Sequence, residues 1–136
     1  MKKSILKQAL AIARRNIKEH PEFDNFLHFT FIVQDGKIIE WGTNNRRSVP
    51  IHYGYGARYK SVTYSPKTHS EVEAYRKARG LINKLKPFYA INIRLNRKGS
   101  LRRSKPCWCC YLLLASLGCR RFFYTADDSF EILKIV

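Results

Sequence analysis

The chain lacks any long apolar run. Its 136 residues contain no stretch of roughly 18 consecutive apolar residues, the length that a membrane-spanning helix needs, so we expect no contact with the membrane interior. Met1-Lys2-Lys3 is not followed by an extended apolar segment with a small-residue cleavage site, so a secretory signal is not expected. Internal repeats, domain linkers and low-complexity segments are also missing. We therefore expect one intracellular domain that spans residues 1–136.

Acidic residues are scarce. Asp and Glu number 10 against 26 Lys and Arg, which gives a formal net charge of +16. Between Glu40 and Asp127 there are 18 Lys or Arg, and the only acids are Glu71 and Glu73. Such a positive field attracts polyanions. The alternative interpretation is a surface that only keeps the protein soluble. Solubility could equally come from a mixture of positive and negative residues, so the excess of positive charge favours nucleic acid as the partner.

Cysteine is limited to four residues, Cys107, Cys109, Cys110 and Cys119. In a chain without a secretory signal, a Cys-x-x-Cys pair accompanied by His indicates a metal site more often than two disulfides. Cys109 and Cys119 are then spare thiols. Apolar residues make up 45% of the chain, which excludes a disordered protein and supplies a core for one domain.

Hydrophobic periodicity predicts an alternation of helices and strands. The expected helices are 4–19, 69–80 with Thr68 as N-cap, and 107–117; the expected strands are 27–34, 37–42, 88–95, 120–125 and 130–136. Asp35-Gly36 predicts a hairpin turn, and the short connection after residue 125 predicts an antiparallel pair. The element order predicts one sheet with helices packed on it.

Two short motifs carry chemistry: His69-Ser70-Glu71, and Pro106-Cys107 followed by Cys110. One imidazole and two thiolates can hold zinc tetrahedrally and leave the fourth position to water. Glu71 cannot easily share the metal, but it can sit beside the water and move its protons. A purely structural zinc site would need a fourth protein ligand, for which the sequence offers three candidates: His28, His52 and Cys109.

H-x-E followed by P-C-x-x-C resembles the signature of the zinc-dependent cytidine deaminase superfamily. Gly42-Thr43-Asn44 is similar to the family's Gly-x-Asn segment, and residues 118–124 are similar to its next strand, most closely in small deaminases of phages and large DNA viruses. The resemblance covers most of the chain. It implies an α/β fold of three layers, in which one five-stranded mixed sheet carries helices on its faces, and one bound Zn²⁺.

The mechanism that this resemblance implies is hydrolytic deamination of cytosine to uracil. Zinc lowers the pKa of its water toward ~7. Glu71 takes a proton from this water and then protonates, in two transfers, the ring nitrogen and the leaving ammonia. Substrate contacts are expected from Asn44, Ser70, Trp108 and Tyr124. Ser70 stands where relatives frequently have Ala or Val. For Trp108, packing in the core is the alternative.

Several features favour single-stranded nucleic acid, DNA before RNA, as the substrate, because a deaminase cannot reach an amine inside a duplex. Enzymes that resemble the deoxycytidylate deaminases usually carry Asn where this chain has Glu73. Residues 122–128 resemble the aromatic-acidic loop of vertebrate polynucleotide cytidine deaminases, although those chains continue into a helix. Candidate contacts to bases and phosphates are Arg46, Arg47, Tyr53, Tyr55, Tyr59, Arg97, Lys98, Arg102, Arg103 and Lys105.

Three alternative functions stay open at this point. The first is a deaminase of free deoxycytidylate or cytidine, and the second deaminates adenosine in tRNA. The third, from another class, is a zinc-stabilised nucleic-acid-binding module without catalysis. As to oligomeric state, a monomer is expected, although relatives that act on free nucleosides often form oligomers.

Overall fold

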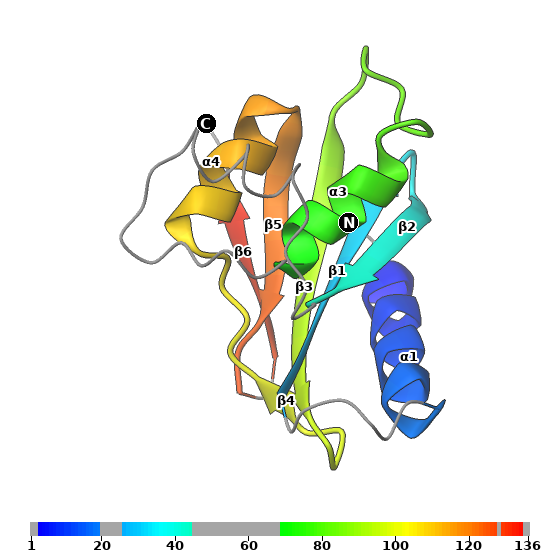
Figure 1. Ribbon diagram of the computed structural model, residues 1–136, viewed down its shortest axis with the longest axis vertical. Coiled ribbons are helices and arrows are strands. Elements are labelled where there is room, and N and C mark those ends of the chain that lie inside the picture. The colour runs from blue at the N-terminus through cyan, green and yellow to red at the C-terminus, as the bar shows by residue number, and fades with distance from the viewer. Residues whose placement is uncertain (1–2, 20–25, 45–68, 128, 135–136) are drawn as a thin grey trace.

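The computed structural model describes residues 3–19, 26–44, 69–127 and 129–134 (Figure 1). The helices are α1 (Lys3–Glu19), α3 (Ser70–Ala78) and α4 (Trp108–Ser116), and the strands are β1 (Phe26–Gln34), β2 (Lys37–Thr43), β3 (Phe88–Asn96), β4 (Leu101–Arg102), β5 (Cys119–Thr125) and β6 (Phe130–Lys134). Every predicted helix and strand is present within a few residues of its expected bounds. None of the described helices has the length and apolar character needed to cross a bilayer.

The strands form one mixed sheet in the order β2-β1-β3-β5-β6, with the short β4 paired to β3. β3 and β5 run parallel, while the other pairs are antiparallel. The predicted antiparallel pairing of the last two strands is therefore confirmed. β4 was not predicted: it places part of the cationic segment 97–105, which reads from sequence as a solvated loop, against the end of β3.

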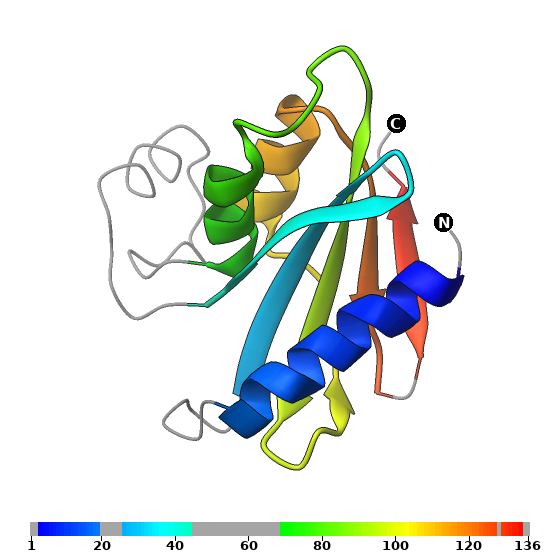
Figure 2. The same cartoon turned by 90° about the vertical axis from the view of Figure 1, so that its right-hand side faces the viewer.

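Helices cover both faces of this sheet, which gives the expected three layers (Figures 1 and 2). α1 lies on one face, and α3 and α4 lie side by side on the other. Alternation along β1 explains this arrangement, because successive side chains of a strand point to opposite faces. Phe29 and Phe31 pack with the α1 core, whereas Ile32 packs with α3 and α4. Full burial of each such side chain contributes about 1.5–3 kcal/mol.

The hairpin between β1 and β2 forms at the predicted turn. Asp35 has φ of 54° and Gly36 has φ of 73°. A two-residue turn with positive φ at both positions matches the right-handed twist of the strands. The prediction from the Asp-Gly pair is confirmed.

β2 ends in close contact with α3, and a glycine makes this approach possible. A Cβ atom on Gly42 would lie 2.5 Å from the backbone nitrogen of Ala74 and 2.9 Å from the backbone carbon of Glu73. Any larger side chain would therefore separate β2 from α3. This contact helps to place the first turn of α3 over the sheet.

Both helices on this face begin one residue later than predicted. His69, not Thr68, is the N-cap of α3, with extended backbone and no capping hydrogen bond from its side chain. Cys107 is the N-cap of α4, and its Sγ accepts a hydrogen bond from the Cys110 N–H at 3.4 Å. The two cap positions are thus occupied by residues whose side chains approach each other, with 3.6 Å between His69 Nδ1 and Cys107 Sγ.

Candidate metal centre and active site

The caps of α3 and α4 bring three metal-ligating side chains together. His69 Nδ1 lies 3.6 Å from Cys107 Sγ and 3.4 Å from Cys110 Sγ, and all three donor atoms lie within 4.8 Å of one another. Tetrahedral zinc with Zn–S of about 2.3 Å and Zn–N of about 2.0 Å places sulfur and nitrogen about 3.6 Å apart. The donor types and their spacing therefore fit zinc.

The electrostatics of this group favour a thiolate. The neighbouring Cys110 thiol, followed by His69, lowers the pKa of Cys107 to about 4. The hydrogen bond to Cys107 raises the pKa of His69. Amides at a helix N-terminus also stabilise negative charge. Because the thiolate is the metal-binding form of cysteine, the helix start and the imidazole both prepare Cys107 for a cation.

The described residues contribute three ligands to this group. His28 and Cys109, two of the candidates for a fourth ligand, are not part of it, and His52 lies outside the described residues. Cys109 is buried. His28 is half-buried on β1, and burial, followed by the charges of Arg94 and His69, lowers its pKa to about 4. The part of the chain that the structure describes thus matches a zinc site with an open position better than one with four protein ligands.

Glu71 lies in the first turn of α3, two residues after His69. Its side chain is buried, with 6% exposed. Burial, followed by the nearby Cys107 sulfur, raises the pKa of Glu71. Ser70 Oγ donates a hydrogen bond to Glu71 Oε1 at 2.8 Å. A buried carboxyl group with a raised pKa suits a residue that alternately accepts and donates a proton.

Behind Glu71 lies a buried polar network that sequence reasoning missed. Ser70 Oγ is 2.8 Å from Thr30 Oγ1, which in turn donates to Asn92 Oδ1 at 2.8 Å. Asn92 Nδ2 donates to the Ser104 carbonyl at 3.2 Å, and Ser104 Oγ donates to the Asn92 carbonyl at 2.8 Å. The one available signal was Asn92 between Ile91 and Ile93 in the predicted strand 88–95, since a buried amide needs partners.

Asn44, the expected substrate contact after β2, is held against β1. Its backbone N–H donates to the His28 carbonyl at 3.2 Å, and its Oδ1 accepts from the His28 N–H at 3.1 Å. Because Oδ1 is engaged, a substrate would meet the NH₂ group as a donor. The backbone pair also keeps Asn44 beside His28, whose ring lies in the electrostatic neighbourhood of His69.

Trp108 follows the candidate ligand Cys107 directly and is 62% exposed. Packing in the core, the alternative from sequence, is therefore wrong: the first turn of α4 turns this residue outward. Its ring stacks on Tyr111 with 5.4 Å between centroids and 16° between planes. Tyr124, in contrast, is only 6% exposed, and the Arg103 guanidinium lies 6.0 Å from its ring centroid. A contact between Tyr124 and substrate stays a prediction.

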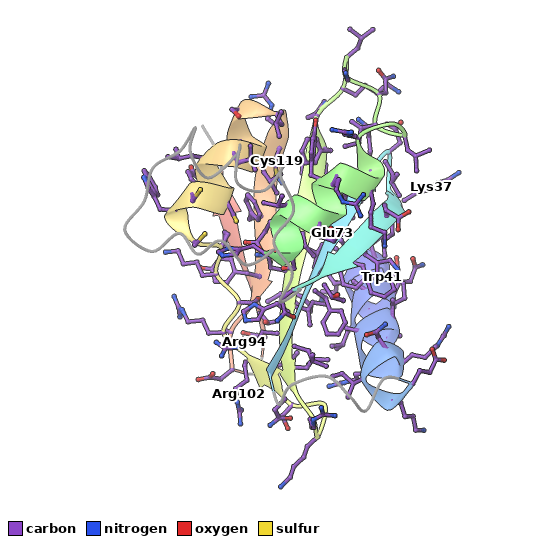
Figure 3. All side chains as sticks on the ribbon, in the orientation of Figure 1. Lys37, Trp41, Glu73, Arg94, Arg102 and Cys119 are labelled. Carbon is purple, nitrogen blue, oxygen red and sulfur yellow. The ribbon has the colours of Figure 1, made fainter. Side chains whose placement is uncertain are left out.

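The cationic segment before Cys107 is exposed at all five of its Lys and Arg residues: Arg97, Lys98, Arg102, Arg103 and Lys105. Arg102 on β4 is the register partner of Arg94 on β3, and both are labelled in Figure 3. Sequence reasoning missed Arg94, which is half-buried and lowers the pKa of His28. The other expected nucleic-acid contacts, Arg46, Arg47, Tyr53, Tyr55 and Tyr59, lie outside the described residues.

The chain is similar to solved deaminase structures. The dCMP deaminase from cyanophage S-TIM5 in apo form gives a TM-score of 0.55 at 16% identity, over 90% of this chain and 82% of that chain. The same enzyme in complex with dCMP and dUMP gives 0.55 at 15%, over 90% and 81%. Cytidine deaminase from Mycobacterium leprae gives 0.51 at 17%, over 96% and 91%.

Sequence comparison adds nothing to this likeness, since no protein-family model and no curated protein matches the chain. The structural likeness extends over 90% and 96% of this chain for the two proteins. This protein therefore has the fold of the phage dCMP deaminase and the mycobacterial cytidine deaminase.

Proposed function

We propose that the protein is a zinc-dependent deaminase that converts cytosine and water into uracil and ammonia. The observation that carries this proposal is the buried Glu71 carboxyl two residues from His69, in a donor set whose spacing fits zinc. His69, Cys107 and Cys110 would hold the zinc ion, which would supply a water of lowered pKa.

The chain's own residues then have distinct roles. Glu71 accepts a proton from the attacking water and passes it to the ring nitrogen. It then accepts the second proton, from the oxygen added to the ring carbon, and delivers it to the leaving amine. The side-chain oxygen Oδ1 of Asn44 accepts a hydrogen bond from the His28 backbone N–H, so the NH₂ group of Asn44 donates to an oxygen of the substrate. Burial of Glu71 keeps competing water away from the proton that it carries.

Single-stranded nucleic acid is the substrate that we propose. Trp108 presents an exposed ring, backed by Tyr111, one residue after the ligand Cys107. Stacking of a base on such a ring contributes ~1–3 kcal/mol. Exposed Arg102, Arg103 and Lys105 precede the same ligand along the chain and suit the phosphates of a strand that extends beyond the target base.

Substitution of Glu71 tests the enzyme. Zinc-loaded Glu71→Gln should keep the metal and the melting temperature of the native protein but lose about 10²–10⁴-fold in turnover. Glu73→Gln is the matched control, because Glu73 lies two residues further along α3 and pairs with Arg76 at 2.6 Å. Unchanged turnover in Glu71→Gln would remove this carboxyl group from the mechanism.

The substrate is tested by incubating the zinc-loaded protein with a cytosine-containing single strand, its duplex and dCMP, and by measuring uracil. We expect turnover on the single strand and little on the duplex. Turnover confined to dCMP would instead favour a free-nucleotide deaminase, like the cyanophage dCMP deaminase of the same fold. Binding of the single strand without uracil formation would favour a zinc-stabilised binding module.

A further inference from the structure

Ser70 stands between the metal ligand His69 and Glu71, and its side chain links Glu71 to the sheet. The residue is 2% exposed. Its Oγ lies 2.8 Å from Glu71 Oε1 and 2.8 Å from Thr30 Oγ1. α3 and β1 are 40 residues apart in the sequence at this contact, so the hydroxyl pair is a tertiary and not a local interaction.

Thr30 is itself held in one orientation. It lies on β1, directly opposite Asn92 of β3 in the register of the sheet, and it is fully buried. The Asn92 amide is oriented by Ser104, because Nδ2 donates to the Ser104 carbonyl and so turns Oδ1 toward Thr30. The Thr30 and Ser70 hydroxyl groups carry one hydrogen each. When Ser70 donates to Glu71, the hydrogen between Thr30 Oγ1 and Ser70 Oγ comes from Thr30; when Thr30 donates to Asn92, Ser70 donates to Thr30 and a protonated Glu71 donates to Ser70.

The result is a rigid support under a flexible side chain. A Glu side chain has three rotatable bonds, and in a buried setting its carboxyl group needs defined partners. The Ser70 hydroxyl supplies one partner on the side of the sheet, at hydrogen-bond distance. Proton transfer requires the donor and acceptor oxygens to lie within about 2.6–3.2 Å, so the orientation of Glu71 matters for the rate.

We propose that Ser70 is a positioning residue that holds the Glu71 carboxyl group in the orientation for proton transfer, with Thr30 and Asn92 anchoring Ser70 to the sheet. This inference rests on the proposed deaminase function and adds a determinant of its rate. Ser70 acts through Glu71 and not by contact with the metal. Removal of the Ser70 hydroxyl group should therefore lower kcat, while KM and zinc binding stay close to those of the native protein.

The first experiment compares Ser70→Ala with Ser116→Ala in zinc-loaded protein. Ser116 makes the matched control, because its hydroxyl bonds to Leu113 within α4 and has no part in the network. We expect Ser70→Ala to lose roughly tenfold or more in kcat, with KM within about twofold and one zinc retained. Native kcat in Ser70→Ala, or a loss of zinc together with activity, would overturn the positioning role.

The second experiment asks whether the anchor matters. Thr30→Val keeps the shape of the side chain but removes the hydroxyl group, whereas Thr30→Ser keeps the hydroxyl group. We expect Thr30→Val to lower kcat by roughly threefold or more and Thr30→Ser to restore most of it. Because the two residues act in series, Thr30→Val should have little further effect once Ser70 is Ala. Additive losses in the double variant would contradict this.

A third measurement does not depend on turnover. Crystal structures of the zinc-loaded native protein and Ser70→Ala should show the Glu71 carboxyl group rotated or distributed over more than one rotamer in the variant. An unmoved, single orientation in Ser70→Ala would refute the inference whether or not the protein is active. If native protein and Ser116→Ala fail to deaminate any cytosine substrate, the proposed function fails, and this comparison of structures still decides the role of Ser70.

Discussion

His69 Nδ1 lies 3.4 Å from Cys110 Sγ, although 41 residues separate the two in the sequence. The contact exists because two helix N-termini meet on one face of the sheet. Substitution of Cys110 should therefore abolish stoichiometric zinc binding. We expect Cys110→Ala to purify with less than about one tenth of the native zinc, since three protein ligands are the minimum for a catalytic site.

The neighbouring cysteine provides the control for this prediction. Cys109 is buried but does not belong to the ligand group. Cys109→Ala should therefore retain one zinc per chain, as measured by metal analysis after gel filtration. Equal zinc contents in the two variants would place the metal elsewhere.

Trp108→Ala should weaken the action on a single strand more than the action on dCMP. The exposed ring can stack on a base next to the target, and a mononucleotide has no such base. Loss of stacking worth ~1–3 kcal/mol predicts a rise in KM for the strand of roughly 5–150-fold. Trp108→Phe should recover part of the loss because it keeps a stacking surface. Equal effects on strand and mononucleotide would argue against stacking of a neighbouring base.

Arg102→Ala/Arg103→Ala should reduce the salt dependence of single-strand binding. Each phosphate contact contributes about 0.7 to the slope of log K against log salt on single strands, so the pair should lower the slope by about 1.4. Arg79→Ala/Lys84→Ala removes the same charge from exposed positions at the far end of α3 and beyond it. Titrations at several salt concentrations measure both slopes. The same slope in the two double variants would mean that Arg102 and Arg103 do not contact phosphate.

Gly42→Ala should destabilise the fold by about 1–3 kcal/mol, because the added Cβ atom would lie 2.5 Å from the Ala74 nitrogen and force β2 away from α3. Gly80→Ala is the control, since a Cβ atom there meets nothing within 4 Å. Urea unfolding of both variants gives the two free energies. A stability of Gly42→Ala equal to that of Gly80→Ala would show that the helix can shift without cost.

The stability of the fold at alkaline pH should depend on the buried thiol of Cys119. Burial raises the pKa of this thiol to about 12, from an ordinary value of 9.0. A group whose pKa is raised on folding contributes stability that is full below pH 9 and is lost as the pH rises toward 12. Native protein should thus lose about 1 kcal/mol more than Cys119→Ala when the pH rises from about 9 to about 10, because the unfolded thiol is already half ionised at pH 9. Parallel unfolding curves for both proteins at the two pH values test this difference.

The sequence by itself determined the local features. Asp35-Gly36 turns the chain because its own φ values suit a tight hairpin, and alternation along residues 27–34 assigns side chains to two faces. The two halves of the candidate zinc site were readable for the same reason: Cys107 and Cys110 come within reach of one ion by spacing alone, and His69 with Glu71 repeats a motif of fixed separation. Such relations depend on neighbours in the chain, so a pattern of residue types is enough to predict them.

Only the tertiary structure decided which residues from different strands and helices contact each other. Thr30 meets Asn92 because β1 and β3 pair in one register out of several, and it meets Ser70 because α3 packs over that point. Trp108 is exposed because α4 lays its other side on the sheet. Register and packing come from the summed burial of many distant side chains, which no short motif contains. The residue types of the candidate metal site could therefore be read from the sequence, whereas their meeting across 41 residues and the contacts of Glu71 came from the tertiary structure.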